Sequence, residues 1–300
     1  MWEVIQFLLP PFVACVTILG LLGYLGMHVL RREIIFIDIA LAQIAAVGAT
    51  FAHVYLGTEE NSLWAYLCAF GFTILASLFF SQIDKRITQI THEAIIGVTY
   101  AIAAATAIFI LAMAAGGDVH MEHMLTGSIL WAQWPDIGTI AILFGCVGLF
   151  HLIFRKHFIR LSENYGGGVV RNERAVWWDF LFYVSMGLVI TFSVKIAGVL
   201  VIFSFLIIPT TVAAMFAESW GKRLVIAWSV GIIALVFGLM LSYFLDFSCG
   251  PSVVTVLGLA LIVTAVFRKF RQMITKPQHC QDQNDRTPHD EHPDSNARSL

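Results

Sequence analysis

Residues 32–53 read REIIFIDIALAQIAAVGATFAH, and this segment sets the class of the protein because it is a long apolar run with few charges. A membrane-spanning helix needs about 20 mostly apolar residues, since the hydrocarbon core of a bilayer is ~30 Å thick. The run meets that length. It also contains Asp38, and a carboxylate is costly in an apolar helix. The first question that the sequence raises is therefore what Asp38 does.

The composition of the whole chain agrees with a membrane protein. Of its 300 residues, 58% are hydrophobic and 13% are charged, against about a quarter charged in soluble domains. The mean hydropathy is +0.80. The net charge of -2 indicates no class of partner, and the five cysteines form neither a CxxC pair nor a disulfide framework.

The apolar runs predict an all-α polytopic membrane protein with about nine transmembrane helices. The first run lacks a basic segment and a small-residue cleavage site, so we expect a retained helix rather than a signal peptide. Two runs nearly touch at residues 194–195, and the count falls by one if they fuse. The runs lie at 6–29, 34–56, 62–82, 93–115, 136–154, 176–194, 197–217, 223–245 and 250–267.

The basic residues predict the orientation. Lys and Arg cluster in every second connection, and cytoplasmic loops carry an excess of these residues. With the N-terminus outside and the C-terminus cytoplasmic, all of the 18 basic residues except Lys195 are cytoplasmic. We therefore expect a membrane domain over 1–275. The polar tail 276–300 has too few apolar residues to fold, so we expect it to be disordered and cytoplasmic.

The motifs that are absent exclude several activities. The sequence has no HExxH zinc motif and no GxSxG elbow, which argues against an intramembrane enzyme. It has no GxxxxGK[ST] phosphate loop, so the chain does not itself hydrolyse ATP by the usual phosphate cradle. Its helices carry too few ionisable residues for a proton relay.

Five segments, in order, carry a family resemblance. They are LGYLGMHVLRREIIFIDIALAQIAAVGA (22–49), HEAIIGVTYAIAAATAIFIL (92–111), LTGSILW (125–131), KIAGVLVIFSFLIIPTTVAAMFA (195–217) and GLMLSYFLDFSCGPSVV (238–254). Over roughly residues 6–268 the chain resembles the membrane permease subunit of bacterial ABC importers for zinc, manganese or iron.

The resemblance implies an assembly in the bacterial inner membrane. We expect two permease chains in a homodimer, cytoplasmic ABC ATPase subunits, and a periplasmic or extracellular metal-binding protein. It implies a transport subunit rather than an enzyme, with a divalent metal ion as cargo, no permanently bound cofactor and no nucleic-acid partner.

The loop 155–175, RKHFIRLSENYGGGVVRNERA, is the longest internal cytoplasmic loop. Its LSENYGG segment lies where the family places a short coupling helix. Each glycine costs ~1 kcal/mol inside a helix, so we expect a short helix that lies before or after Gly166–Gly168. The alternative is a plain basic loop. The candidate ATPase contacts are Ser162, Glu163, Asn164, Arg171 and Arg174.

Asp38 has two interpretations. The family carries Gly-Asp-x-x-x-His on its second helix, but here Gln43 takes the histidine position and Asp38 that of the glycine. Five residues correspond to about 140° around a helix, so Asp38 and Gln43 share a face only if a π-bulge intervenes. They then form a metal site in the transport path. Alternatively, Asp38 is structural and pairs with Arg31 or Arg32, or stabilises the helix N-terminus.

Two further groups are candidate metal ligands. The outer loop holds His120, Glu122 and His123, which either receive metal from the binding protein or form a solvated docking loop. The tail holds His279, His289 and His292, which either sense imported metal or are simply solvated.

Other transport functions stay open. The departure at Gln43 is compatible with a permease for a metal chelate or another small solute, and a secondary carrier would need no ATPase. The oxygen ligands favour manganese or iron over zinc but do not decide the metal.

Overall fold

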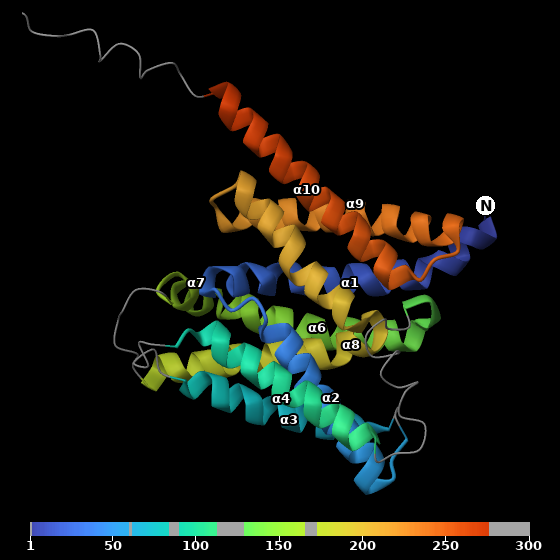
Figure 1. Ribbon diagram of the computed structural model, residues 1–300, viewed down its shortest axis with the longest axis vertical. Coiled ribbons are helices and arrows are strands. Elements are labelled where there is room, and N and C mark those ends of the chain that lie inside the picture. The colour runs from blue at the N-terminus through green and yellow to red at the C-terminus, as the bar shows by residue number, and fades with distance from the viewer. Residues whose placement is uncertain (1, 60–61, 84–89, 113–128, 166–172, 276–300) are drawn as a thin grey trace, which may run out of the picture.

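A computed structural model of the chain describes residues 2–59, 62–83, 90–112, 129–165 and 173–275, and every regular element in these ranges is a helix (Figure 1). The elements are α1 (Trp2–Arg32), α2 (Ile37–Leu56), α3 (Leu63–Gln82), α4 (His92–Ala112), the 3₁₀ turn η1 (Ile129–Trp131), α6 (Trp134–Ile153), α7 (Arg155–Glu163), α8 (Glu173–Phe216), α9 (Trp220–Leu245) and α10 (Cys249–Thr275).

The all-α polytopic prediction is confirmed. Within the described ranges, eight helices are long and apolar enough to cross a membrane. The sequence predicted about nine. The difference arises because the runs at 176–194 and 197–217 join in α8 through one non-helical residue, Gly198.

The bend in α8 explains how one helix contains two runs of spanning length. A straight helix of its 44 residues would be ~66 Å long, about twice the thickness of the hydrocarbon core. Figure 1 shows instead that the second half of α8 turns back towards the end of the bundle where α8 began. Gly198, at φ 77° and ψ 158°, makes that turn.

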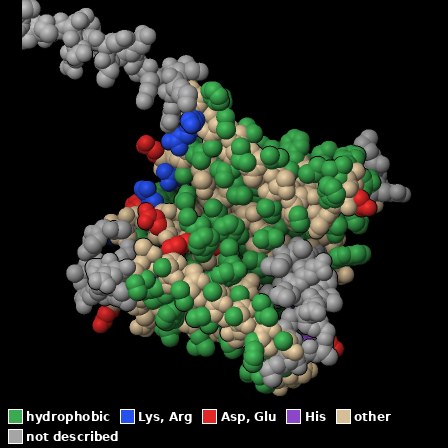
Figure 2. Space-filling view, in the orientation of Figure 1, with side chains coloured by type: hydrophobic (Ala, Val, Ile, Leu, Met, Phe, Trp, Pro, Cys, Tyr) green, Lys and Arg blue, Asp and Glu red, His purple; other side chains and the backbone are tan. Residues whose placement is uncertain are grey.

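The surface carries many large apolar side chains. On α4, Ile102 and Phe109 are 62% and 69% exposed, and Ile142 on α6 is 72% exposed. Figure 2 shows a face that is largely hydrophobic, with its Lys and Arg side chains gathered near the end of α10. On a water-soluble protein, so many exposed apolar side chains would favour aggregation, whereas the lipid tails of a bilayer solvate them. The surface therefore agrees with a multi-pass membrane protein; the orientation of the termini stays a prediction.

Several helices approach each other closely at a glycine. On α1, a Cβ at Gly26 would lie against the backbone carbonyl oxygen of Leu206 on α8 and within 2.9 Å of Thr210 Cγ2. Membrane helices gain no hydrophobic driving force from one another, so small residues that allow close backbone packing stabilise their interfaces. The α1–α8 contact depends on this position.

Gly26→Ala is expected to destabilise the folded protein by about 1–3 kcal/mol, because the added methyl group must force α1 and α8 apart. The matched control is Gly20→Ala on the same helix, where nothing lies within 4 Å of a Cβ. Thermal unfolding of the purified variants measures the difference. Equal unfolding temperatures for the two variants would contradict the prediction.

Candidate functional site

Asp38 lies in the first turn of α2 and is 1% exposed. Neither of its carboxylate oxygens has a hydrogen-bond partner among the described residues. The residue before the helix, Phe36, offers no side-chain cap. A negative charge in the first turn is favoured by the helix macrodipole, which compensates only part of the cost of burial. Asp38 is therefore a buried carboxylate that no side chain of the described residues pairs with.

The ion pairs predicted for Asp38 are wrong. The guanidinium of Arg32 binds Asp179 instead, with Nη1 2.8 Å from Oδ1. The side chain of Arg31 is exposed, and no ion pair joins it to Asp38 among the described residues. What remains of the structural interpretation is the position of Asp38 at the helix N-terminus.

A second carboxylate lies at the N-terminus of α2. Glu93, in the first turn of α4, accepts a hydrogen bond through Oε1 from the backbone N–H of Phe36 at 3.0 Å. The first N–H groups of a helix have no partner within it, so Glu93 caps α2 from a neighbouring helix. Its Oε2 atom is buried and has no partner among the described residues. Glu93 and Asp38 thus flank the start of α2.

Gln43 does not join Asp38 on one face. α2 is an uninterrupted α-helix from Ile37 to Leu56, so the proposed π-bulge is absent and that hypothesis is wrong. Both side chains are buried, yet five residues along a regular helix place them about 140° apart. In the part of the chain that the structure describes, no group of three His, Cys, Asp or Glu residues is arranged to hold a metal ion.

Several predicted site residues lie outside the described residues. They belong to the outer loop, the coupling loop and the tail, and they stay predictions: His120, Glu122, His123, Arg171, His279, His289 and His292.

The short helix expected in the 155–175 loop is present. It is α7, which ends at Glu163, before the three glycines. It exposes basic side chains, including those of Lys156 and Arg160, and the predicted contact Asn164 follows it with an exposed side chain. Arg174, in the first turn of α8, is exposed as well. These positions lie at an end of the bundle, and in Figure 1 α7 is at the left, beside the end of α1.

Ser162 differs from the other predicted contacts because its side chain points inward. It is 1% exposed, and its Oγ accepts a hydrogen bond from Arg32 Nε at 2.9 Å. The same hydroxyl lies 2.8 Å from His28 Nδ1. Since arginine can only donate, the Ser162 proton is free for the imidazole. In this conformation Ser162 is a buried link rather than a surface contact.

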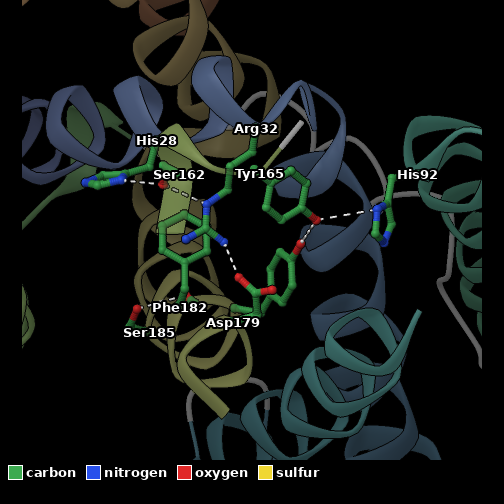
Figure 3. A network of polar contacts seen from close by, with 9 residues as sticks. His28, Arg32, His92, Ser162, Tyr165, Asp179, Phe182 and Ser185 are labelled. Carbon is green, nitrogen blue, oxygen red and sulfur yellow. Dashed lines mark hydrogen bonds and ion pairs between the residues drawn. The ribbon is translucent and has the colours of Figure 1, made fainter. Parts of the chain in front are cut away.

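The buried ion pair extends this link across three helices (Figure 3). Arg32, on α1, contacts Ser162 on α7 and Asp179 on α8, and both partners of the ion pair have 0% exposed side chains. The guanidinium also lies 3.9 Å from the ring centroid of Phe182, a cation–π geometry. One buried cation therefore holds the ends of α1, α7 and α8 together.

A tyrosine pair continues the network towards α4. The hydroxyl oxygen of Tyr165, just after α7, lies 3.0 Å from the hydroxyl oxygen of Tyr183 and 3.4 Å from His92 Nδ1 (Figure 3). His92 is the first residue of α4, next to Glu93. The network thus reaches the residue next in sequence to the one that caps α2.

The sequence contained one signal for this network. Asp179 lies inside the apolar run 176–194, and a charge within a membrane segment implies a buried partner. It is absent from the predicted site residues. Its partner was not available from spacing, because 147 residues separate Arg32 from Asp179.

The helices, the lipid-compatible surface and the buried charge network define a polytopic all-helical membrane protein. Its sequence matches the ABC 3 transport family over residues 4–268. The chain belongs to this family, and it is therefore a membrane component of a transport system rather than an enzyme.

Known relatives span nearly the whole chain. The probable iron transport system membrane protein of Haemophilus influenzae is 21% identical over 271 residues, which cover 90% of this chain and 93% of the relative. The manganese transport system membrane protein MntC of Listeria monocytogenes is 21% identical over 271 residues, which cover 87% of this chain and 91% of the relative. PsaBC from Streptococcus pneumoniae in complex with Fab contains a chain of similar fold, with a TM-score of 0.71 and 21% identity over 87% of this chain and 93% of that one.

Proposed function

We propose that this protein is the permease subunit of an ABC importer that moves a divalent transition metal ion across a bacterial inner membrane. The observation that carries the proposal is the family match over residues 4–268. Relatives named for iron and for manganese transport support the class of cargo. Manganese or iron is favoured over zinc, since the candidate ligands on the path are oxygen atoms.

The energy source in this proposal is a separate ATPase that docks on α7. This helix has nine residues, is too short to span the membrane and carries exposed basic side chains. Glu163, Asn164 and Arg174 are the proposed contacts that lie at the surface. A second copy of this chain and an external metal-binding protein complete the importer.

Asp38 is the proposed cargo contact at the inner part of the path. Its two carboxylate oxygens are buried and have no protein partner among the described residues, so they are available to a passing cation. Glu93 offers a further unpartnered oxygen, Oε2, at the same helix end. Because α2 is regular, Gln43 contacts the cargo only at another point of its passage.

The test of the proposal is total cellular manganese, iron and zinc by elemental analysis under metal limitation, with the gene present and deleted. Deletion is expected to lower one metal selectively. Asp38→Asn is expected to reduce uptake of that metal at least about tenfold, the lower end of the effect of losing a supporting group at a metal site. The matched control is Asp246→Asn, which changes an exposed carboxyl at the end of α9.

The outcomes separate the two parts of the proposal. No change in any metal on deletion would contradict metal import. Normal uptake by Asp38→Asn, with the protein present in the membrane, would assign Asp38 to the N-terminus of α2 alone.

A further inference from the structure

We propose that Ser162 and Arg32 are positioning residues that fasten α7 to α1 and α8, so that these elements move as one body when the ATPase moves α7. The inference rests on the proposed function. It gives Ser162 a role different from the predicted ATPase contact: the hydroxyl transmits motion inside the permease and does not touch the partner.

α7 depends on its anchors for a fixed position. A helix of nine residues is marginal on its own in water, because the cost of nucleation is not recovered over so few residues. Its buried face consists of Phe158 and Ser162, which are four residues apart and therefore adjacent on the helix. Phe158 is 0% exposed and stacks on His151 of α6, with ring centroids 4.2 Å apart.

Ser162 supplies the polar half of this anchor. His28 and Arg32 are also four residues apart, on α1, so both point to the same side and meet at one hydroxyl group. Figure 3 shows the two side chains approaching Ser162 from the α1 helix. On its other side Arg32 binds Asp179. A displacement of α7 that kept these bonds would carry α1 and α8 with it.

A further contact ties α7 to α9. Glu163 accepts a hydrogen bond from Trp220 Nε1 at 3.1 Å, and Trp220 is the first residue of α9. The centroid of the Trp220 ring lies 4.8 Å from that of His28, which contacts Ser162. The same short helix is therefore held against α1, α6, α8 and α9.

Two routes lead from this anchor to Asp38. The first is along the chain, since Arg32 ends α1 and α2 begins five residues later, at Ile37. The second passes from Tyr165 to His92, whose neighbour Glu93 holds the N–H of Phe36. Spatial contiguity alone does not establish coupling, so both the mobility of α7 and the coupling of import to ATP hydrolysis are measured.

The test compares Ser162→Ala with Ser193→Ala in the full chain. Ser193 is a matched control because it is buried and its hydroxyl has no hydrogen-bond partner among the described residues. Hydrogen exchange of the α7 amides is measured in the purified protein in lipid nanodiscs. Ser162→Ala is expected to speed this exchange about tenfold, since hydrogen bonds to charged groups are stronger than average, and Ser193→Ala is expected to leave it unchanged.

The second measurement is Mn²⁺ imported per ATP hydrolysed by the importer reconstituted in liposomes. Ser162→Ala is expected to lower this ratio several-fold while ATP hydrolysis continues, because the ATPase then moves a loosened α7. A merely structural serine would lower both activities together and leave the ratio unchanged.

Either of two results would overturn the proposal: unchanged α7 exchange in Ser162→Ala, or faster exchange with an unchanged ratio of import to hydrolysis. A failure of the proposed function looks different. The wild-type chain would then import none of Mn²⁺, Fe²⁺ and Zn²⁺, whereas the exchange measurement does not depend on transport and still decides whether Ser162 anchors α7.

Discussion

Gly198→Ala is expected to remove most of the correctly folded protein from the membrane. At φ 77° and ψ 158°, Gly198 occupies a backbone region that is essentially open to glycine alone, and forcing a residue with a Cβ into such a region costs at least about 1–3 kcal/mol. The residue is also buried, so the chain around it has little freedom to adjust. With alanine the turn is strained, and a straight α8 of ~66 Å does not fit a hydrocarbon core of ~30 Å.

The measurement for Gly198→Ala is the yield of monodisperse protein after detergent extraction, together with its thermal unfolding. Gly258→Ala in α10 is the control, because nothing lies within 4 Å of a Cβ there and its φ is not positive. That control is expected to match the wild type or to be slightly more stable. A Gly198→Ala protein with wild-type yield and unfolding temperature would show that the bend does not need glycine.

Asp179→Leu is expected to destabilise the protein by about 3–5 kcal/mol, because it leaves the buried guanidinium of Arg32 without its counter-ion. The Coulomb attraction lost is only part of this cost. The larger part is the desolvation of a charge that has no route to water, since the Arg32 side chain is 0% exposed.

The control for Asp179→Leu removes both charges at once. Arg32→Met with Asp179→Leu is expected to recover most of the lost stability, as apolar replacements of buried ion pairs often do. Chemical or thermal unfolding of the two single variants and the double variant gives the coupling energy. If Asp179→Leu alone unfolds like the wild type, the ion pair contributes nothing to the fold.

The stability result and the role of Ser162 are separable. The double variant replaces the ion pair between α1 and α8 with an apolar contact. It also leaves Ser162 without its arginine partner. We expect a stable protein in which α7 is less firmly held. That combination distinguishes the stabilising function of the ion pair from its positioning function.

The local features of the chain were predictable. The apolar runs gave the bounds of the membrane helices to within four residues, except that α10 continues eight residues beyond the predicted end at 267. The length and apolarity that a bilayer requires are properties of consecutive residues. That any helix in the 155–175 loop is short was predictable for a similar reason, because three glycines in a row disfavour a helix. The sequence leaves open on which side of Gly166–Gly168 the helix lies, and α7 shows that it comes before them. Both properties depend on neighbours in the sequence.

The candidate site was predicted only in part. Asp38 was identified because a carboxylate in an apolar run stands out, and the structure shows that it is buried. Its predicted arginine partners were wrong, since adjacency in the sequence suggested Arg31 and Arg32 while the fold brings Asp179 to Arg32. The π-bulge was wrong because the similarity to the family motif had suggested a shared face that a regular α2 does not provide.

The sequence by itself determined that this chain is a helical membrane protein, where its helices lie and that any helix in the longest internal loop is short. Those properties follow from solvation by the bilayer and from backbone propensity, which act residue by residue. Only the tertiary structure decided that Gly198 turns α8 back, that Glu93 caps α2, and that Arg32 joins Ser162 to Asp179. The physical reason is that a buried charge takes whichever partner the packed helices bring within reach, and here that partner lies 147 residues away.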